Sequence, residues 1–238
     1  MAFVDDYNTW VTGFSVEANR DGIQAIIDRA VWWEKRSGVT FEGDKTVIIY
    51  FTRRSDRTST LPFTIKGEAI APSNTAKILG VIMDTQLRYK QHIAKSTTKG
   101  LLAELALKRL RLTSPSTARQ LFRATVVPIV DYALNVWKHA CRNKAMALMN
   151  KIQRLGQQAV TGVFRTVATA VAEAEASIRA VSERHAERAT KFWVNLRTLP
   201  DTNPLSKLNA RQLWRFASPL QKIADAHLGT PTGRMETI

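Results

Sequence analysis

The pattern of hydrophobic and polar residues changes near residue 88, from short strand-like runs to helical spacing. At the start, residues 2–4 and 7–11 flank the pair Asp5-Asp6, which predicts a β-hairpin with its turn at the two acids. Further strands are predicted at residues 47–51, at 63–65 and 68–70 around a Lys66-Gly67 turn, and at 78–82, where Gly80 indicates a bulge.

One amphipathic helix is predicted within this first part. Its isoleucines and alanines recur at three- and four-residue spacing between residues 23 and 31, and Gly38 is suited to end it. After residue 88 the spacing is helical throughout. Ser114-Pro115 predicts a helix start, and Pro128 is expected to kink or split that helix. Helices are predicted at residues 92–111, 114–137, 145–159, 168–194 and 211–226. The chain is therefore expected to be α+β.

Charge changes this picture, because the chain carries a net charge of +15 and the excess is concentrated. Residues 77–165 hold sixteen Lys and Arg against three acids, a net +13, whereas the remainder holds nineteen against seventeen. Such concentration favours a polyanionic partner, that is, a nucleic acid. The alternative is a solvated basic surface that serves solubility alone.

Composition excludes several other classes. Cys141 is the only cysteine, so no internal disulfide forms, and with four histidines it makes a structural zinc site improbable. No apolar run is long enough to span a membrane, and the first residues carry acids rather than the basic start of a secretory signal. We expect an intracellular protein, nuclear or cytoplasmic, that is not secreted.

The pair Asp5-Asp6, within Phe3-Val4-Asp5-Asp6, is the sharpest candidate for chemistry. Nucleotidyl transfer uses carboxylates to hold two divalent cations at the attacking and leaving oxygens, and carboxylates are ligands that Mg²⁺ prefers. Isolated Asp-Asp pairs are common, and the alternative is a solvated turn.

The order of several short motifs resembles the reverse transcriptase of non-LTR (LINE-like) retrotransposons. The similarity covers most of residues 2–200, and it starts at the aromatic-x-Asp-Asp box formed by Phe3 to Asp6. The motifs that follow are Gly38-Val39-Thr40-Phe41 with Lys45-Thr46, the strand at 49–52, Leu79-Gly80-Val81-Ile82-Met83-Asp84, Asp131-Tyr132-Ala133 with Trp137, Ile152-Gln153-Arg154, and residues 162–166.

This resemblance implies roles for individual residues. It implies that Asp5 and Asp6 are catalytic and bind Mg²⁺, and that Lys45 donates a proton to the leaving pyrophosphate. It also implies that Leu79 and Gly80 contact the primer. Lys45 has the alternative of an ordinary exposed lysine, and Leu79-Gly80 that of a strand with a bulge. Tyr132 and Trp137 are candidates for stacking on bases, with helix core as the alternative.

The resemblance also implies three regions. A partial antiparallel palm sheet with one packed helix is expected at residues 1–88, a helical thumb at 89–165 and a helical connecting region at 166–238. Phosphate contacts are expected from basic residues of the thumb and its entry, namely Arg88, Lys90, Lys95, Lys99, Arg119 and Arg123.

The departure from the family pattern is equally informative. In the family, the fingers and the palm motif with the other essential aspartate precede the Asp-Asp box, and here only Met1 and Ala2 precede Phe3. We therefore expect an incomplete metal site and a chain that does not polymerise on its own. The expected partners are an RNA template with a DNA primer, and the missing N-terminal half of the polymerase. The alternatives are a basic non-enzymatic nucleic-acid-binding module or a decayed retroelement remnant.

Overall fold

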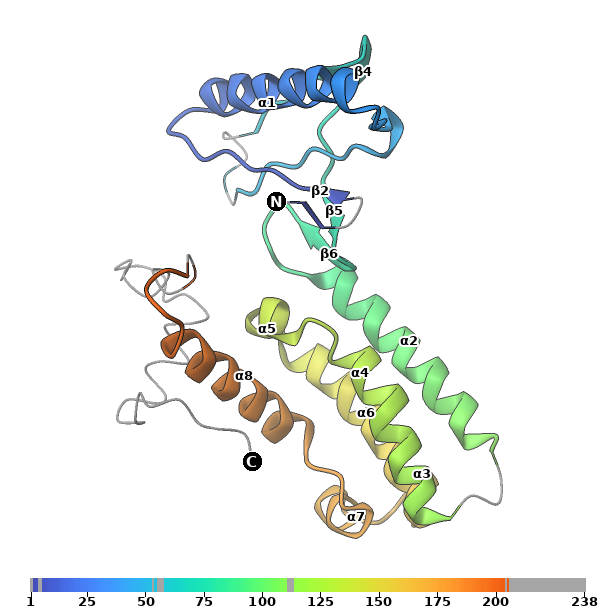
Figure 1. The fold of residues 1–238 in the computed structure, drawn as a ribbon. Helices are drawn as coiled ribbons and strands as arrows, with labels where there is room; N and C mark the ends of the chain where they lie inside the picture. Colours follow the sequence, from blue (N-terminus) through green and yellow to red (C-terminus); the bar gives the residue numbers. More distant parts are fainter. Residues whose placement is uncertain are drawn as a thin grey trace. The chain divides into compact units, whose positions relative to one another are not determined.

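The computed structural model describes residues 2–3, 6–52, 54, 58–110, 114–203 and 205, with the side chains of residues 2, 3 and 6 left aside. Contacts divide the chain into two compact units, Met1–Gln91 and His92–Ile238. The predicted helix at residues 211–226 lies outside the described residues. Helices and strands occur together, which confirms a mixed α+β chain (Figure 1). The palm, thumb and connecting regions at 1–88, 89–165 and 166–238 stay predictions.

The first unit contains three separate two-stranded antiparallel sheets among its described residues. The expectation of one partial sheet is therefore not met there. Each sheet is a hairpin of neighbouring strands: β1 (Ala2–Phe3) with β2 (Asp6–Tyr7), β3 (Phe63–Ile65) with β4 (Glu68–Ile70), and β5 (Thr75–Ile78) with β6 (Val81–Asp84).

The opening hairpin is confirmed, but its return strand is shorter than predicted. Phe3 is paired with Asp6, so Asp6 belongs to β2 and not to the turn. The residues that connect the strands, Val4 and Asp5, lie outside the described residues.

The predicted strand at residues 78–82 is wrong, because Leu79 and Gly80 form a hairpin turn between β5 and β6. Ile78 pairs with Val81, and both intervening residues have positive φ, 45° for Leu79 and 83° for Gly80. Two positive φ values are the pattern of a tight turn that matches strand twist. The Lys66-Gly67 turn is confirmed and has the same pattern, with φ of 52° and 88°.

The predicted strand at residues 47–51 is also wrong. The run lies beside the third hairpin, where Ser73 N–H donates to the Ile48 carbonyl at 2.7 Å and Thr52 N–H donates to the Thr85 carbonyl at 2.9 Å. These two hydrogen bonds fix the position of the run, but they are isolated and do not form the repeated pairing of a β-sheet. Its β-branched sequence suits a strand, but a strand also needs a partner along its length.

Helix α1 (Val16–Ser37) starts earlier than its isoleucine pattern indicates, because the Ser15 hydroxyl accepts from Ala18 N–H and caps it. Gly38 ends it with φ of 71°, as predicted. The short helix η1 (Gly43–Lys45) follows. None of the residues in α1 is fully buried.

Gln24 is the main polar link between α1 and that hairpin. Its amide donates to the Thr64 carbonyl at 2.9 Å and accepts from Thr64 N–H at 3.1 Å, as a neighbouring strand would. Lys66 adds an ion pair to Glu34 at 2.5 Å. These bonds satisfy the open edge of β3, which would otherwise be available to another chain.

The second unit is helical in its described residues, and two of its predicted boundaries are confirmed. Ser114 caps α3 with Pro115 as the first helical residue, and Gly162 ends α6 with φ of 70°. The helices are α2 (Lys90–Lys108, whose first two residues belong to the first unit), α3 (Pro115–Leu121), the π-helix η3 (Phe122–Val126), α4 (Val127–Val130), α5 (Leu134–Trp137), the 3-10 helix η4 (Lys138–Ala140), α6 (Asn143–Thr161), α7 (Thr169–Ala176) and α8 (Val181–Arg197).

Pro128 was predicted to kink or split its helix; the backbone stays helical across it, but the turn before it widens into the π-helix η3. A proline cannot donate to the preceding turn and its ring crowds the carbonyl there, which the wider turn relieves. The chain changes direction after α4 ends, where Ala133 has φ of 52°. The single helix predicted at residues 168–194 is wrong, because Ser177 has φ of 49° and separates α7 from α8.

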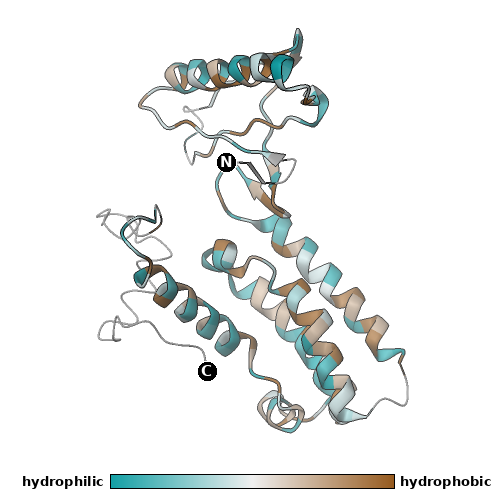
Figure 2. Cartoon of the chain, viewed as in Figure 1, coloured by the Kyte–Doolittle hydropathy of each residue, from teal (hydrophilic) through white to brown (hydrophobic). Residues whose placement is uncertain are grey.

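Two glycines in the helical core leave no room for a side chain, because neighbouring helices pack directly against them. A Cβ at Gly100 would lie 2.3 Å from Val130 Cγ2, and one at Gly156 would lie 2.2 Å from Phe122 Cε2. These two positions bring α2 close to α4 and α6 close to η3. Around them lies an apolar core that includes Val126, Val130, Trp137, Met149 and Val181. Figure 2 shows hydrophilic residues along the length of α8.

None of the helices in the described parts of the chain has the length and the apolar composition needed to span a membrane.

Candidate nucleic-acid interface

The predicted catalytic residues all belong to the first unit, and the structure describes only Lys45 among them in full. Asp5 and the side chain of Asp6 lie outside what the structure describes. Lys45 lies in η1, largely exposed, with an ion pair to Glu42 at 2.5 Å. Among the described residues, no group of three His, Cys, Asp or Glu side chains could hold a metal ion. The catalytic and Mg²⁺ roles stay predictions.

Leu79 and Gly80, the predicted primer contacts, occupy the exposed tip of the β5–β6 hairpin. At the end of the hairpin, Asp84 organises the entry to α2. Its carboxylate accepts from the backbone N–H groups of Arg88 at 3.0 Å and Tyr89 at 2.6 Å. The family-like segment from Leu79 to Asp84 thus ends in a carboxylate that is engaged locally.

Most of the basic side chains in residues 77–165 are exposed. Twelve of the fifteen Lys and Arg that the structure describes there are exposed, namely Lys77, Arg88, Lys90, Lys95, Lys99, Lys108, Arg109, Arg123, Arg142, Lys144, Lys151 and Arg165. Of the predicted phosphate-binding residues, Arg88, Lys90, Lys95, Lys99 and Arg123 are in this set. Lys95 and Lys99 lie one turn apart on α2, as their spacing predicts.

Arg119, the sixth predicted contact, is half-buried, and its Nε is enclosed without a hydrogen-bond partner in the described structure. Two further cations of the segment serve the fold. Lys138 donates to the His185 carbonyl at 3.0 Å, and Arg154 donates to the carbonyls of Arg165 and Val167. Arg154 therefore fixes the chain that leaves α6, a role the resemblance did not indicate.

The three acids of the same segment offer no exposed negative charge to offset these cations. Asp84 is half-buried and bonded to backbone N–H groups, Glu104 is fully buried, and Asp131 is 3% exposed. The exposed charge of the described part of this segment is therefore mainly positive. The sequence did not predict the burial of these three acids, because the spacing of residues along the chain does not show which acids are buried.

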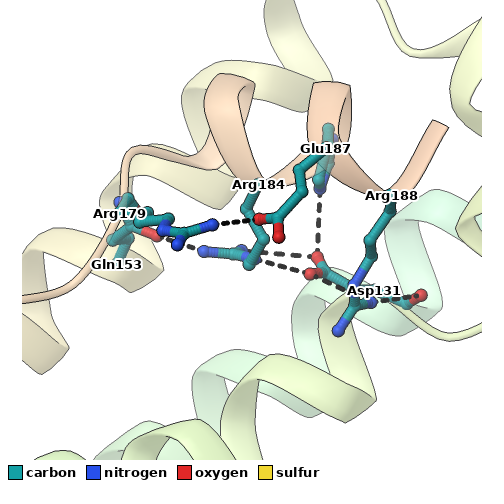
Figure 3. A network of polar contacts seen from close by, with 7 residues as sticks. Asp131, Gln153, Arg179, Arg184, Glu187 and Arg188 are labelled. Carbon is teal, nitrogen blue, oxygen red and sulfur yellow. Dashed lines mark hydrogen bonds and ion pairs between the residues drawn. The ribbon is translucent and has the colours of Figure 1, made fainter. Parts of the chain in front are cut away.

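Asp131 lies at the centre of a buried polar network that joins α8 to the corner between α4 and α5 (Figure 3). Arg184 Nε donates to Asp131 Oδ2 at 2.6 Å, and His185 Nε2 lies 3.0 Å from Oδ1. Arg188 Nη1 lies 3.3 Å from Oδ2. Two arginines and a histidine of one helix thus surround a carboxylate more than fifty residues earlier in the chain.

Gln153 of α6 extends the network to α7. Its Oε1 accepts from Arg184 Nη1 at 2.7 Å, and its Nε2 donates to Glu173 Oε1 at 2.9 Å. Gln153 is 3% exposed, so these bonds are shielded from water. The family-like motifs containing Asp131 and Gln153 therefore meet in space, with Arg184 between them.

The chemistry of Asp131 reflects two opposing influences. Burial raises the pKa of its carboxyl, but hydrogen bonds from His185 and Arg184 and the charge of Arg184 outweigh burial, so the pKa lies below its ordinary value. Trp137 packs edge-on against the His185 ring at 6.2 Å, and it is fully buried. Trp137 is therefore core and cannot stack on bases, whereas Tyr132 is half exposed.

Comparisons with known proteins agree with the resemblance seen in the motifs. The chain is 27% identical over 143 residues to a probable RNA-directed DNA polymerase from the transposon X-element of Drosophila melanogaster, covering 57% of this chain and 15% of that protein. It is 23% identical over 229 residues to the RNA-directed DNA polymerase from mobile element jockey of Drosophila funebris, covering 93% of this chain and 24% of that protein. No family model and no solved structure matches the chain.

These similarities confirm the predicted relationship to reverse transcriptases of the LINE-like, non-LTR class. The chain spans about a quarter or less of the length of the two relatives.

Replacing Asp131 by Asn tests whether its network holds the second unit together. The variant keeps the shape but leaves Arg184 and Arg188 without a buried counter-charge, so we expect a loss of about 3–5 kcal/mol in the free energy of unfolding at pH 7. Urea unfolding measures this loss. Because the folded pKa is depressed, the stabilisation is present above the ordinary aspartate pKa and is lost as pH falls through the folded value. Exposed Asp201→Asn is the control, and equal stability of the two variants would contradict the account.

Glu104 provides a second, opposite pH dependence. Burial raises the pKa of its carboxyl to about 7, against a smaller lowering by Lys108. The folded chain therefore keeps the proton longer than the unfolded chain, and stability falls as pH rises from about 4.5 to about 7. Glu104→Gln removes this loss and should be more stable than the parent chain by about 1–3 kcal/mol at pH 8, with no difference near pH 4. Thermal unfolding at both pH values, with exposed Glu183→Gln as control, measures it; a gap that persists at pH 4 would point to another cause.

Proposed function

We propose that this chain is the palm-to-thumb portion of a reverse transcriptase of a non-LTR retrotransposon, and that its helical unit binds the RNA–DNA duplex of primer and template. Two relatives named as RNA-directed DNA polymerases support the class of protein. The observation that carries the binding proposal is the exposure of twelve basic side chains in residues 77–165 while all three acids there are buried or engaged.

The proposed contact is electrostatic and indifferent to base sequence. Lys and Arg side chains that meet phosphates position a protein on a duplex, whereas specific recognition requires groups that reach base edges. The exposed cations of this surface are dispersed over several helices and loops, an arrangement that suits phosphates along a backbone. Lys95 and Lys99 on α2, with Arg123 after α3, are the residues we assign to this contact in the second unit.

Asp5, Asp6 and Lys45 are proposed to contribute to polymerisation in the context of a longer protein. The two aspartates suit Mg²⁺, which supplies charge stabilisation at the transferred phosphoryl group when bound. We propose that the 238 residues alone do not extend a primer, because the relatives that carry the activity in their names are more than four times longer than the matched region. The N-terminal remainder of such a polymerase is the proposed protein partner.

Neutralising Lys95 and Lys99 together tests the proposed contact. The variant Lys95→Gln/Lys99→Gln should weaken binding of an RNA–DNA duplex about five- to tenfold at low salt, because two phosphate contacts are lost. Fluorescence anisotropy with a labelled duplex measures the Kd. The control Lys35→Gln/Lys191→Gln removes two exposed charges elsewhere in the chain and should leave binding nearly unchanged. If both double variants lost the same affinity, the effect would come from the lower net charge and not from contacts at Lys95 and Lys99, which would contradict the proposal.

The absence of polymerisation has a separate test. With a primed RNA template, deoxynucleotides and Mg²⁺, the purified chain should give no more extension than its Asp5→Asn variant, because the relatives named for this activity are several times longer than the matched region. Gel analysis of the labelled primer reads this out. Extension by the parent chain that Asp5→Asn abolishes would refute the proposed dependence on further polymerase segments.

A further inference from the structure

Phe164 is the most exposed large apolar side chain among the described residues of the second unit, with 81% of its surface accessible. It lies in the loop between α6 and α7, two residues after Gly162 ends α6. Single exposed apolar side chains are common on proteins, so exposure alone assigns no role to the ring. The backbone of the loop, its charge and its exposed neighbours add the evidence for one.

The backbone that carries Phe164 is fixed by hydrogen bonds. Val167 N–H donates to the Phe164 carbonyl at 3.1 Å and closes a turn whose central residues are Arg165 and Thr166. Arg154 of α6 donates to the Arg165 carbonyl and, at 3.2 Å, to the Val167 carbonyl. A ring on a backbone fixed in this way loses little conformational freedom when it binds a ligand.

The charge of the surrounding chain is positive without exception. Residues 132–172 contain six Lys and Arg and no Asp or Glu. Arg165, which adjoins the ring in sequence, is exposed. The acids that border this stretch, Asp131 and Glu173, are both bonded within the network centred on Asp131. A ligand at the ring therefore meets a local excess of positive charge, which favours an anionic molecule.

We propose that Phe164 stacks on an unpaired base of single-stranded RNA or DNA, with Arg165 at a neighbouring phosphate. An exposed aromatic ring beside a cation is the combination that binds single strands, because every base offers a face for stacking. Bases inside a duplex are already stacked on one another and offer no free face. The inference rests on the proposed nucleic-acid function, and it adds an unpaired strand to the duplex contacts assigned to Lys95, Lys99 and Arg123.

A protein partner fits this loop less well than a nucleic acid. The core of a protein interface is depleted of charged residues and is built from a contiguous apolar patch. Here the exposed residues on either side of the ring are Gly162, Arg165 and Thr166, whereas Val163 and Val167 are half-buried. A single ring flanked by polar groups suits one flat base, and the positive charge suits the phosphates that come with it.

Labelled single strands of about ten nucleotides test the stacking contact, since single-strand sites are of this length. The probes are a DNA, an RNA of the same base order, and an abasic DNA that keeps the phosphates but has no bases. Fluorescence anisotropy at low salt gives the Kd of the full chain for each. The stronger of the base-bearing probes should bind about fivefold or more tightly than the abasic one, the effect of one stacked base. Equal binding of all three probes would overturn the proposal.

Variants of Phe164 assign the preference for bases to this ring. Phe164→Ala should remove most of the preference and leave binding of the abasic probe nearly unchanged. Phe164→Trp keeps a face for stacking and should retain the preference, whereas Phe164→Leu keeps only apolar surface and should behave as the alanine variant does. Arg165→Gln should weaken the base-bearing and abasic probes alike. Phe14→Ala removes a fully exposed ring of the first unit and should bind as the parent chain does.

The outcomes separate stacking from the other uses of an exposed ring. A preference for bases that survives in Phe164→Ala, or is as strong in Phe164→Leu as in the parent chain, would overturn the proposal. So would a change of oligomeric state in Phe164→Ala, measured by sedimentation, without a change in base preference, because the ring would then contact a second copy of the chain. Salt-dependent binding of a blunt RNA–DNA duplex should persist in every Phe164 variant, and its absence from the parent chain would refute the proposed function itself.

Discussion

A carboxylate can be buried in a protein when cations and hydrogen-bond donors replace the water it loses, and Asp131 meets this condition through α8. Arg184, His185 and Arg188 reach it from a helix more than fifty residues later, and Gln153 links the same arginine to α6. Removing one partner of such a cluster leaves the others as uncompensated charges. The corner between α4 and α5 and the position of α8 therefore depend on one another, because neither is satisfied alone.

The burial of acids also determines the charge of the surface. In the segment with the highest positive charge, Asp131 and Glu104 are withdrawn into the interior and Asp84 is bonded to the backbone at the start of α2. Twelve Lys and Arg of the segment remain exposed, because long side chains keep their charged ends in water. The exposed charge of residues 77–165 is therefore mainly positive. Glu104 differs from Asp131 in having no hydrogen-bond partner among the described residues.

Elements with a local cause were predictable from the sequence. Gly38 and Gly162 end helices because they adopt positive φ, and Ser114-Pro115 starts one because its side chain caps the helix. The errors arose where tertiary context decided. Leu79 adopts positive φ although leucine disfavours it, and Ser177 breaks a run of helix-forming residues. Residues 47–51 have strand-like side chains but lack a pairing strand along their length.

The candidate interface was predictable in part for a similar reason. The shared helix face of Lys95 and Lys99 follows from their spacing. The partial burial of Arg119 depends on tertiary packing, and the roles of Lys138 and Arg154 depend on backbone carbonyls elsewhere in the unit. The Asp131 network could not be inferred, because no short spacing relates Asp131 to Arg184. Motif order identified the relatives correctly, and the predicted catalytic aspartates remain outside the described structure or without a described side chain.

The most direct measurement of the central claim is the salt dependence of binding to duplexes of unrelated sequence. If the exposed cations contact phosphates, the logarithm of the binding constant should fall linearly with the logarithm of salt concentration, by about 0.9 per contact, for a slope of several units. Two RNA–DNA duplexes with different sequences should give the same slope and the same affinity. A slope near zero, no binding at low salt, or a tenfold preference for one sequence would contradict the account.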